Sequence, residues 1–95
     1  MPKATYANNV IARSDDVETV EGNLYFPRAS VDMSLLEPST TASTCPWKGA
    51  AQYFHLRVGD TRIEDAAWSY PEPKPAAQAI AGHLAFDIRR GLEVG

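Results

Sequence analysis

Cysteine is almost absent from this sequence, since Cys45 is the only one among 95 residues. No disulfide can therefore form within the chain, although small secreted domains often depend on such cross-links. The residues that follow Met1 contain no apolar segment of the kind that a secretion signal has. The apolar runs elsewhere are too short to span a bilayer. We therefore expect a reducing, cytoplasmic location and no membrane partner.

Positive charge and recognised ligand motifs are scarce as well. The formal net charge is −3, and of the nine Lys and Arg residues only Arg89 and Arg90 are adjacent. Nucleic-acid binders of this size usually carry a basic stripe, so we expect no nucleic-acid partner. One cysteine and two histidines at long spacing do not predict a metal site. No glycine-rich phosphate-binding motif occurs, and the sequence indicates no cofactor.

The composition is that of an ordinary folded domain. Apolar residues make up 44% of the chain and charged residues 22%, which is close to the average for soluble globular proteins. A chain of this length fits one domain and leaves no room for a second. We expect residues 1–95 to form a single domain.

Alternation of apolar and polar residues predicts several strands. The clearest run covers residues 51–58, where Phe54 and Leu56 lie on the apolar face that should meet the core. Gly59-Asp60 reads as a two-residue hairpin turn, from which residues 61–66 return. Shorter strands are expected at residues 10–13, 17–20, 24–26 and 84–88, the last with Leu84, Phe86 and Ile88 on one face. The polar residues 39–44 fit either a loop or an edge strand.

Helix signals are confined to two places. Asp32 can cap a short helical turn that Pro38 ends. Pro75 suits the first position of a helix and Gly82 a helix stop, with Ile80 as the buried anchor. The expected fold is mainly β, a small bent or barrel-like antiparallel sheet with one short α-helix at about residues 75–82.

The segment Cys45-Pro46-Trp47-Lys48-Gly49 has the composition of a tight turn. The first and fourth Cα atoms of such a turn lie within about 7 Å, so the Cys45 thiol and the Lys48 ammonium can approach each other. A nearby cation would favour the thiolate, which is a nucleophile and a redox sensor. The plain structural interpretation is that Cys45 packs as a small apolar group while Lys48 points into water.

Aromatic residues are grouped, at Tyr25-Phe26, at Tyr53-Phe54, and at Trp68 near Tyr70. Alternation sends one member of each adjacent pair into the core, and the other members are free to line a cleft. Asp65 is a carboxylate that could pair with Lys48 or Arg28. The residues expected to contact a ligand are Tyr25, Trp47, Tyr53, Trp68, Tyr70 and His83.

These motifs together resemble the family designated domain of unknown function 427. Its pattern of Tyr-Phe-Pro, Cys-Pro-x-Lys-Gly-x-Ala-x-Tyr, Ala-Trp-x-Tyr and Ile-x-Gly-x-x-Ala-Phe is matched by residues 25–27, 45–53, 67–70 and 80–86. The resemblance covers roughly residues 7–94. It implies a compact, β-rich single domain without an assigned activity, and it marks as site candidates Tyr25, Cys45, Lys48, Tyr53, Trp68, Tyr70 and His83.

Three functions remain open from the sequence. The first is a small-molecule binding module with an aromatic-lined cleft, in which Lys48 holds an anionic group. The second is a cysteine-dependent enzyme or redox sensor with Cys45 as nucleophile and Lys48 as its activator. The third is a non-catalytic protein that forms a homo-oligomer through an exposed strand edge.

Overall fold

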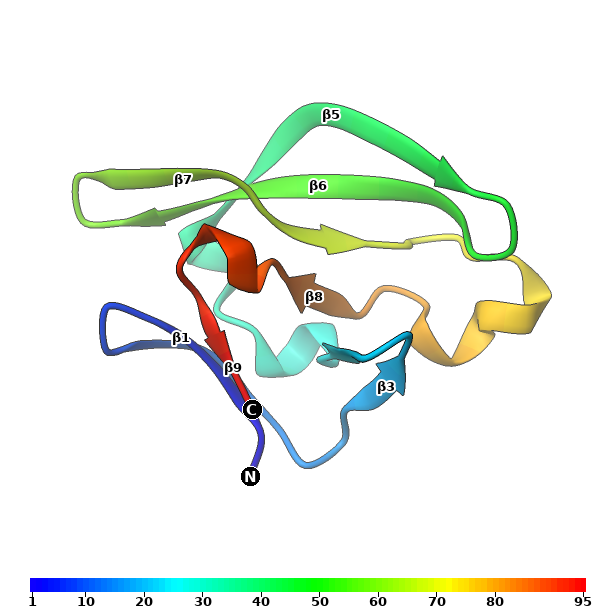
Figure 1. Cartoon of the computed structure of the whole chain (residues 1–95), viewed down its shortest axis with the longest axis horizontal. Helices are drawn as coiled ribbons and strands as arrows, with labels where there is room; N and C mark the ends of the chain where they lie inside the picture. The colour runs from blue at the N-terminus through cyan, green and yellow to red at the C-terminus, as the bar shows by residue number, and fades with distance from the viewer.

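Nine strands in three antiparallel sheets make up the fold, as the computed structural model of residues 1–95 shows (Figure 1). Four short 3₁₀ helices connect some of the strands. The strands are β1 (Lys3–Tyr6), β2 (Asn9–Arg13), β3 (Glu18–Val20), β4 (Asn23–Tyr25), β5 (Leu36–Cys45), β6 (Gly49–Val58), β7 (Thr61–Ser69), β8 (Leu84–Phe86) and β9 (Glu93–Val94). The 3₁₀ helices are η1 (Arg28–Ser30), η2 (Met33–Leu35), η3 (Pro75–Ile80) and η4 (Ile88–Arg90).

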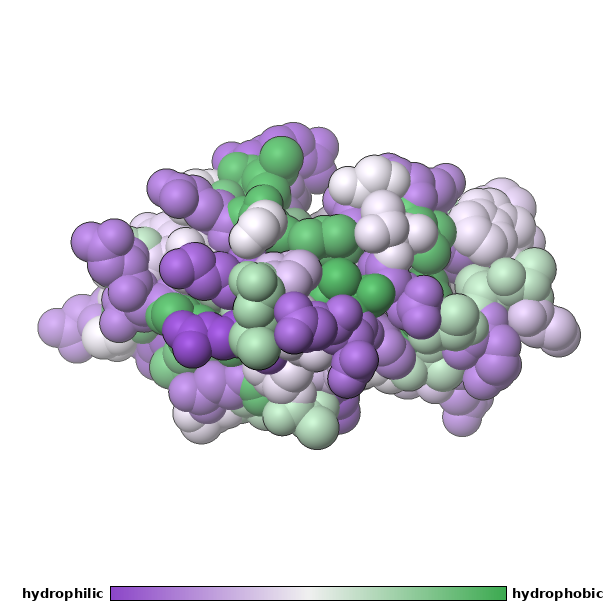
Figure 2. All heavy atoms as spheres, turned by 90° about the horizontal axis from the view of Figure 1, so that it is seen from below, coloured by the Kyte–Doolittle hydropathy of each residue, from purple (hydrophilic) through white to green (hydrophobic).

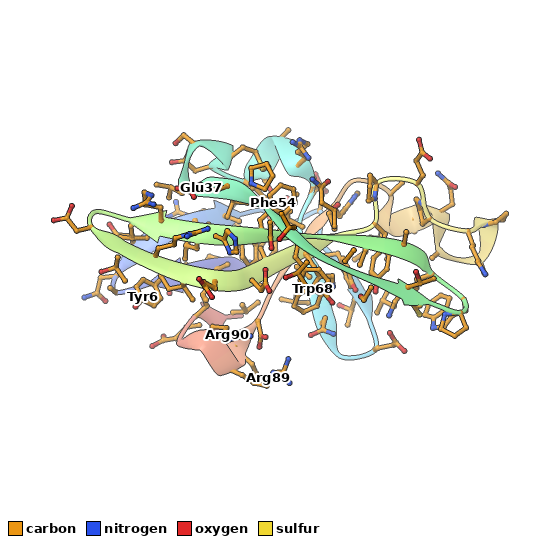
Figure 3. All side chains as sticks on the ribbon, turned by 90° about the horizontal axis from the view of Figure 1, so that it is seen from above. Tyr6, Glu37, Phe54, Trp68, Arg89 and Arg90 are labelled. Atoms are coloured by element: carbon orange, nitrogen blue, oxygen red, sulfur yellow. The ribbon has the colours of Figure 1, made fainter.

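The largest sheet has the strand order β5-β6-β7-β8 and forms one layer of the molecule. Its long strands are strongly twisted when seen from above (Figure 3). Phe54 and Leu56 of β6 face the core and are buried, as their alternation with polar neighbours predicts. The predicted hairpin at Gly59-Asp60 joins β6 to β7.

Two smaller sheets lie beneath this layer (Figure 1). One has the order β2-β1-β9, so the first strand of the chain pairs with the last. The other is the β3–β4 hairpin. Just beyond β4, Phe26 forms a backbone bridge with Leu84 of β8, which ties the hairpin to the large sheet.

Two apolar clusters fill the space between these layers. The larger joins the large sheet to the β2-β1-β9 sheet and includes Phe26, Phe54, Leu56, Leu84 and Phe86. The smaller lies beside η3 and contains Tyr25, Ala51, Tyr70, Ala77, Ile80 and Ala85. From below, most of the surface is hydrophilic, with separate hydrophobic patches between polar groups (Figure 2).

The predicted fold class is confirmed, because the chain is mainly β and its sheets are antiparallel. The sheets bend around the core without closing into a barrel. Residues 39–44 belong to β5, which forms one edge of the large sheet and carries a bulge between Pro38 and Ala42. Asp32 caps η2 as expected, by accepting a hydrogen bond from the Ser34 backbone N–H.

The α-helix predicted at about residues 75–82 is wrong in type. Residues Pro75–Ile80 form the 3₁₀ helix η3, and Ala77 interrupts it with a non-helical backbone at φ −115° and ψ 20°. The segment between Pro75 and Gly82 is too short for a stable α-helix, because helix nucleation is costly and few residues follow to repay it. Ile80 is nevertheless the fully buried anchor that the sequence predicts.

The predicted strand over residues 84–88 ends early, at Phe86. Asp87 caps η4 by accepting a hydrogen bond from the Arg89 backbone N–H, at 2.9 Å. This cap turns the chain, so Ile88 points outward and its surface is 66% exposed. No helix of the chain has the length and apolar character needed to cross a membrane.

Candidate functional site

The turn between β5 and β6 has a fixed shape. Cys45 pairs with Gly49 across the hairpin, and Gly49 adopts φ +109°, which disfavours a side chain. The segment after β7 clamps the turn, because the Lys74 backbone N–H donates to the Lys48 carbonyl at 2.9 Å and the Lys74 Nζ donates to the Pro46 carbonyl at 2.7 Å. The position of Lys48 is thus set by backbone contacts.

The Lys48 side chain turns inward, and only 8% of it is exposed. Its ammonium donates a hydrogen bond to the carboxylate of Glu21, in the turn between β3 and β4. The ring centres of Trp47 and Tyr70 lie 5.2 and 5.4 Å from the same nitrogen, within the range of cation–π attraction. The plain structural interpretation of the sequence placed Lys48 in water. The structure contradicts it, because the Lys48 side chain is almost fully buried.

The protonation of Lys48 follows from these contacts. Burial lowers the pKa of its ammonium, but the Glu21 hydrogen bond and the weaker effects of Tyr70, Tyr25 and Cys45 raise it, and the net pKa lies above that of an ordinary lysine. The same hydrogen bond lowers the pKa of the Glu21 carboxyl against a smaller effect of burial. At neutral pH Lys48 is a fixed cation that attracts anions, and it lacks the free amine that a nucleophile needs.

Lys48 is one of eight residues around a cavity of about 220 Å³. Four of the six predicted ligand-contacting residues surround the same space, namely Tyr25, Tyr53, Trp68 and Tyr70. They come from three different strands and from the residue after β7, and the fold brings them together. The remaining lining residues are Asn23, Asp87 and Arg89.

The aromatic walls are held by contacts with one another. The Trp68 indole N–H donates to the Tyr25 hydroxyl at 3.1 Å, and the two rings meet edge to face, with centroids 6.4 Å apart. Tyr70 packs against Tyr25 at 6.5 Å. Tyr53 shares a hydrogen bond of 3.0 Å with the Ser43 hydroxyl of β5. Burial raises the pKa of the Tyr70 phenol, which Lys48 only partly offsets, so this hydroxyl stays protonated at neutral pH.

Three sequence-predicted residues do not line this cavity. Cys45 is half-buried and packs against the cluster that contains Tyr70 and Ile80. Trp47 is 39% exposed on the outer side of the Lys48 ammonium. The His83 ring lies 3.1 Å from the Ala81 carbonyl and is part of the chain reversal before β8.

Sequence reasoning missed the charged groups at the two ends of the cavity. Asp87 accepts two side-chain hydrogen bonds from Arg89, both of 3.0 Å, and Figure 3 shows Arg89 on the η4 segment that projects beside Trp68. In the sequence, the adjacent Arg89-Arg90 pair was the only feature that pointed to charged residues at the Asp87 side of the cavity. Glu21 lies in the turn between β3 and β4, and nothing local in the sequence links it to Lys48, 27 positions away.

The carboxylate proposed from the sequence as a partner of Lys48 or Arg28 has other partners. Asp65 accepts a hydrogen bond of 2.7 Å from the Thr41 hydroxyl, and its oxygen lies 3.7 Å from the His55 ring. Its backbone N–H donates to the same ring, at 3.1 Å. The chain nowhere gathers three or more His, Cys, Asp or Glu side chains in a way that could hold a metal ion.

Asp87 should make the stability of the protein depend on acid pH. The Arg89 hydrogen bond, with the help of nearby charges and against burial, lowers the pKa of the Asp87 carboxyl. A lowered pKa in the folded state adds stability at neutral pH, and this contribution is lost as pH falls below about 4 and through the folded-state pKa.

Asp87→Asn keeps an oxygen for the cap and removes the charge. The variant should be less stable at pH 7, by under about 1 kcal/mol because Arg89 is exposed, and the difference should shrink as pH falls from about 4 through the folded-state pKa of Asp87. Urea unfolding of both proteins across this range measures it. A difference that stays constant with pH would mean that the charge of Asp87 does not contribute.

Comparison with known proteins identifies one family. The family model described as a domain of unknown function (DUF427) matches residues 3–93. This match confirms the resemblance that the sequence motifs indicate. No curated protein matches the chain.

Proposed function

The chain belongs to the DUF427 family, and we propose that it is a small-molecule binding domain whose ligand carries an anionic group. The observation that carries the proposal is the buried Lys48 ammonium at the wall of an aromatic cavity. A lysine that is 8% exposed carries a desolvation cost, which contact with an anionic group offsets.

The walls of the cavity define the rest of the ligand. Tyr25, Tyr53, Trp68 and Tyr70 offer apolar ring faces with polar tips, which suits a flat ring that bears polar groups. A cavity of about 220 Å³ is smaller than the sites of drug-sized molecules, which begin at about 300 Å³. The ligand is accordingly compact, with a single ring and one carboxylate as the simplest example.

The contacts of the thiol give less support to the cysteine-dependent alternative. Cys45 does not line the cavity, and the Lys48 ammonium is bound to Glu21. Both histidine rings are engaged elsewhere, His55 with Asp65 and His83 with Ala81, so neither is placed as a base for the thiol.

A tryptophan fluorescence titration tests the proposal. The chain has two tryptophans, so Trp47→Phe leaves Trp68 in the cavity wall as the only reporter. Benzoate should change the Trp68 emission in this background. Adding Lys48→Met should weaken benzoate binding by about tenfold or more, since a hydrogen bond to a charged group contributes about 1.5–3 kcal/mol.

Two matched variants control the titration. Lys3→Met removes an exposed lysine from the distant strand β1 and should leave the affinity unchanged. Cys45→Ser should also bind as the parent does, and a loss of binding there would favour the cysteine-dependent alternative. Equal benzoate affinity with and without Lys48 would contradict the proposed function.

A further inference from the structure

The turn Glu21-Gly22 contacts Lys48, a wall residue of the cavity, through the Glu21 carboxylate. Val20 pairs with Asn23 across the β3–β4 hairpin, so Glu21 and Gly22 are its two turn residues. Asn23, the first residue of β4, borders the cavity of about 220 Å³ and also two adjoining hollows of about 310 and 120 Å³. The turn is therefore followed directly by a residue that borders all three spaces.

The turn is held mainly through the Glu21 side chain, by Lys48 and by Trp47. Glu21 adopts φ +54°, a left-handed conformation that is unfavourable for a residue with a side chain. An added Cβ on Gly22 would meet no atom within 4 Å, so the turn is not packed against its surroundings. The opposite end of the hairpin is firmly fixed, because Tyr25 is buried and Phe26 bridges to Leu84. Motion of the hairpin would thus be concentrated at its tip.

The tip of the β3–β4 hairpin is bound to the Lys48 ammonium, the same cation that we propose binds the ligand. The Glu21 side chain is 52% exposed, while the Lys48 side chain that it binds is 8% exposed. The Glu21 carboxylate therefore reaches from the surface onto a nearly buried ammonium. It offers the same chemical group that we assign to the ligand.

We infer that Glu21 occupies the position where the carboxylate of the ligand binds, so that an incoming carboxylate must displace it and release the turn. This inference rests on the proposed function. It specifies the anion as a carboxylate that exchanges with Glu21 on Lys48.

Benzoate binding to Glu21→Gln is the test, measured through Trp68 in the Trp47→Phe background. Removing the competing charge should tighten binding by up to about fivefold, the upper limit for a partly exposed ion pair. Glu18→Gln is the matched control, since Glu18 is an exposed carboxylate of the same hairpin without an ion-pair partner, and its affinity should not change. Benzamide, the uncharged analogue of benzoate, should gain less than benzoate from Glu21→Gln.

The outcomes separate the inference from the proposed function. If the parent binds benzoate and Glu21→Gln binds it equally or more weakly, the inference is overturned and the proposed function stands. Equal gains for benzoate and benzamide overturn the assigned carboxylate position. Binding that appears only in Glu21→Gln supports both proposals, and an absence of benzoate binding in the parent and in Glu21→Gln overturns both.

Discussion

Replacing Phe26 with alanine should lower the free energy of unfolding by about 3–5 kcal/mol. Phe26 is fully buried, and its ring meets that of Phe86 at 5.9 Å in an edge-to-face arrangement. Its backbone also bridges to Leu84, so the side chain fills the junction between the β3–β4 hairpin and the large sheet. The loss would be a large part of the total stability of a domain of this size, which is about 5–14 kcal/mol.

Urea unfolding monitored by circular dichroism measures this effect. Ile88→Ala is the control, because Ile88 is 66% exposed and its truncation should change stability by less than about 0.5 kcal/mol. Similar losses for the two variants would show that neighbouring residues fill the space left by the Phe26 ring, or that this junction contributes little to stability.

Gly49→Ala should destabilise the protein by about 1–3 kcal/mol, the cost of holding a non-glycine residue in a strained backbone conformation. The Gly49 φ of +109° lies outside the region where alanine is stable. A Cβ there would lie 3.5 to 3.6 Å from backbone atoms of Lys74, Glu72 and Pro73, which is ordinary van der Waals contact, so the cost comes from the backbone conformation. Relief of the strain would shift the turn that positions Lys48.

The thermal midpoint and the benzoate affinity of Gly49→Ala report the two consequences separately. Gly59→Asn is the control, since Gly59 has φ +59° and open space around it, and asparagine tolerates this left-handed region. The control should lose less than about 1 kcal/mol. A Gly49→Ala protein as stable as this control would contradict the proposed rigidity of the turn.

Local patterns predicted the parts of the fold that local interactions specify. Strand β6 and the Gly59-Asp60 turn follow from alternation and turn chemistry within a few residues. Ile88 was misplaced for the opposite reason: the cap at Asp87 overrides an alternation that looked continuous. Local propensity likewise suggested an α-helix after Pro75, where the segment proved too short to form one.

In the candidate site, too, the residues in local motifs could be predicted and those placed by long-range pairing could not. Lys48 and the rings of Tyr25, Tyr53, Trp68 and Tyr70 were marked by their grouping and by the family motifs. Glu21 reaches Lys48, and Arg89 reaches the cavity, in a fold where β4 and β8 are joined through Phe26 and Leu84, a pairing between segments almost 60 positions apart. Such long-range pairings leave no trace in the neighbouring sequence, so these charged residues could not be assigned beforehand.

The pairing of β1 with β9 has a consequence for the kinetics of folding. Ala4 lies opposite Val94, so this contact closes a loop of nearly the whole chain, the slowest kind of contact to form. During synthesis at about 5–20 residues per second, one edge of β1 waits roughly 5–18 s for its partner to be made. The buried Leu92, just before β9, arrives equally late. The core is thus completed only after residues 92–94 have been made, and until then the nascent chain exposes an unpaired edge of β1 to chaperones and to aggregation.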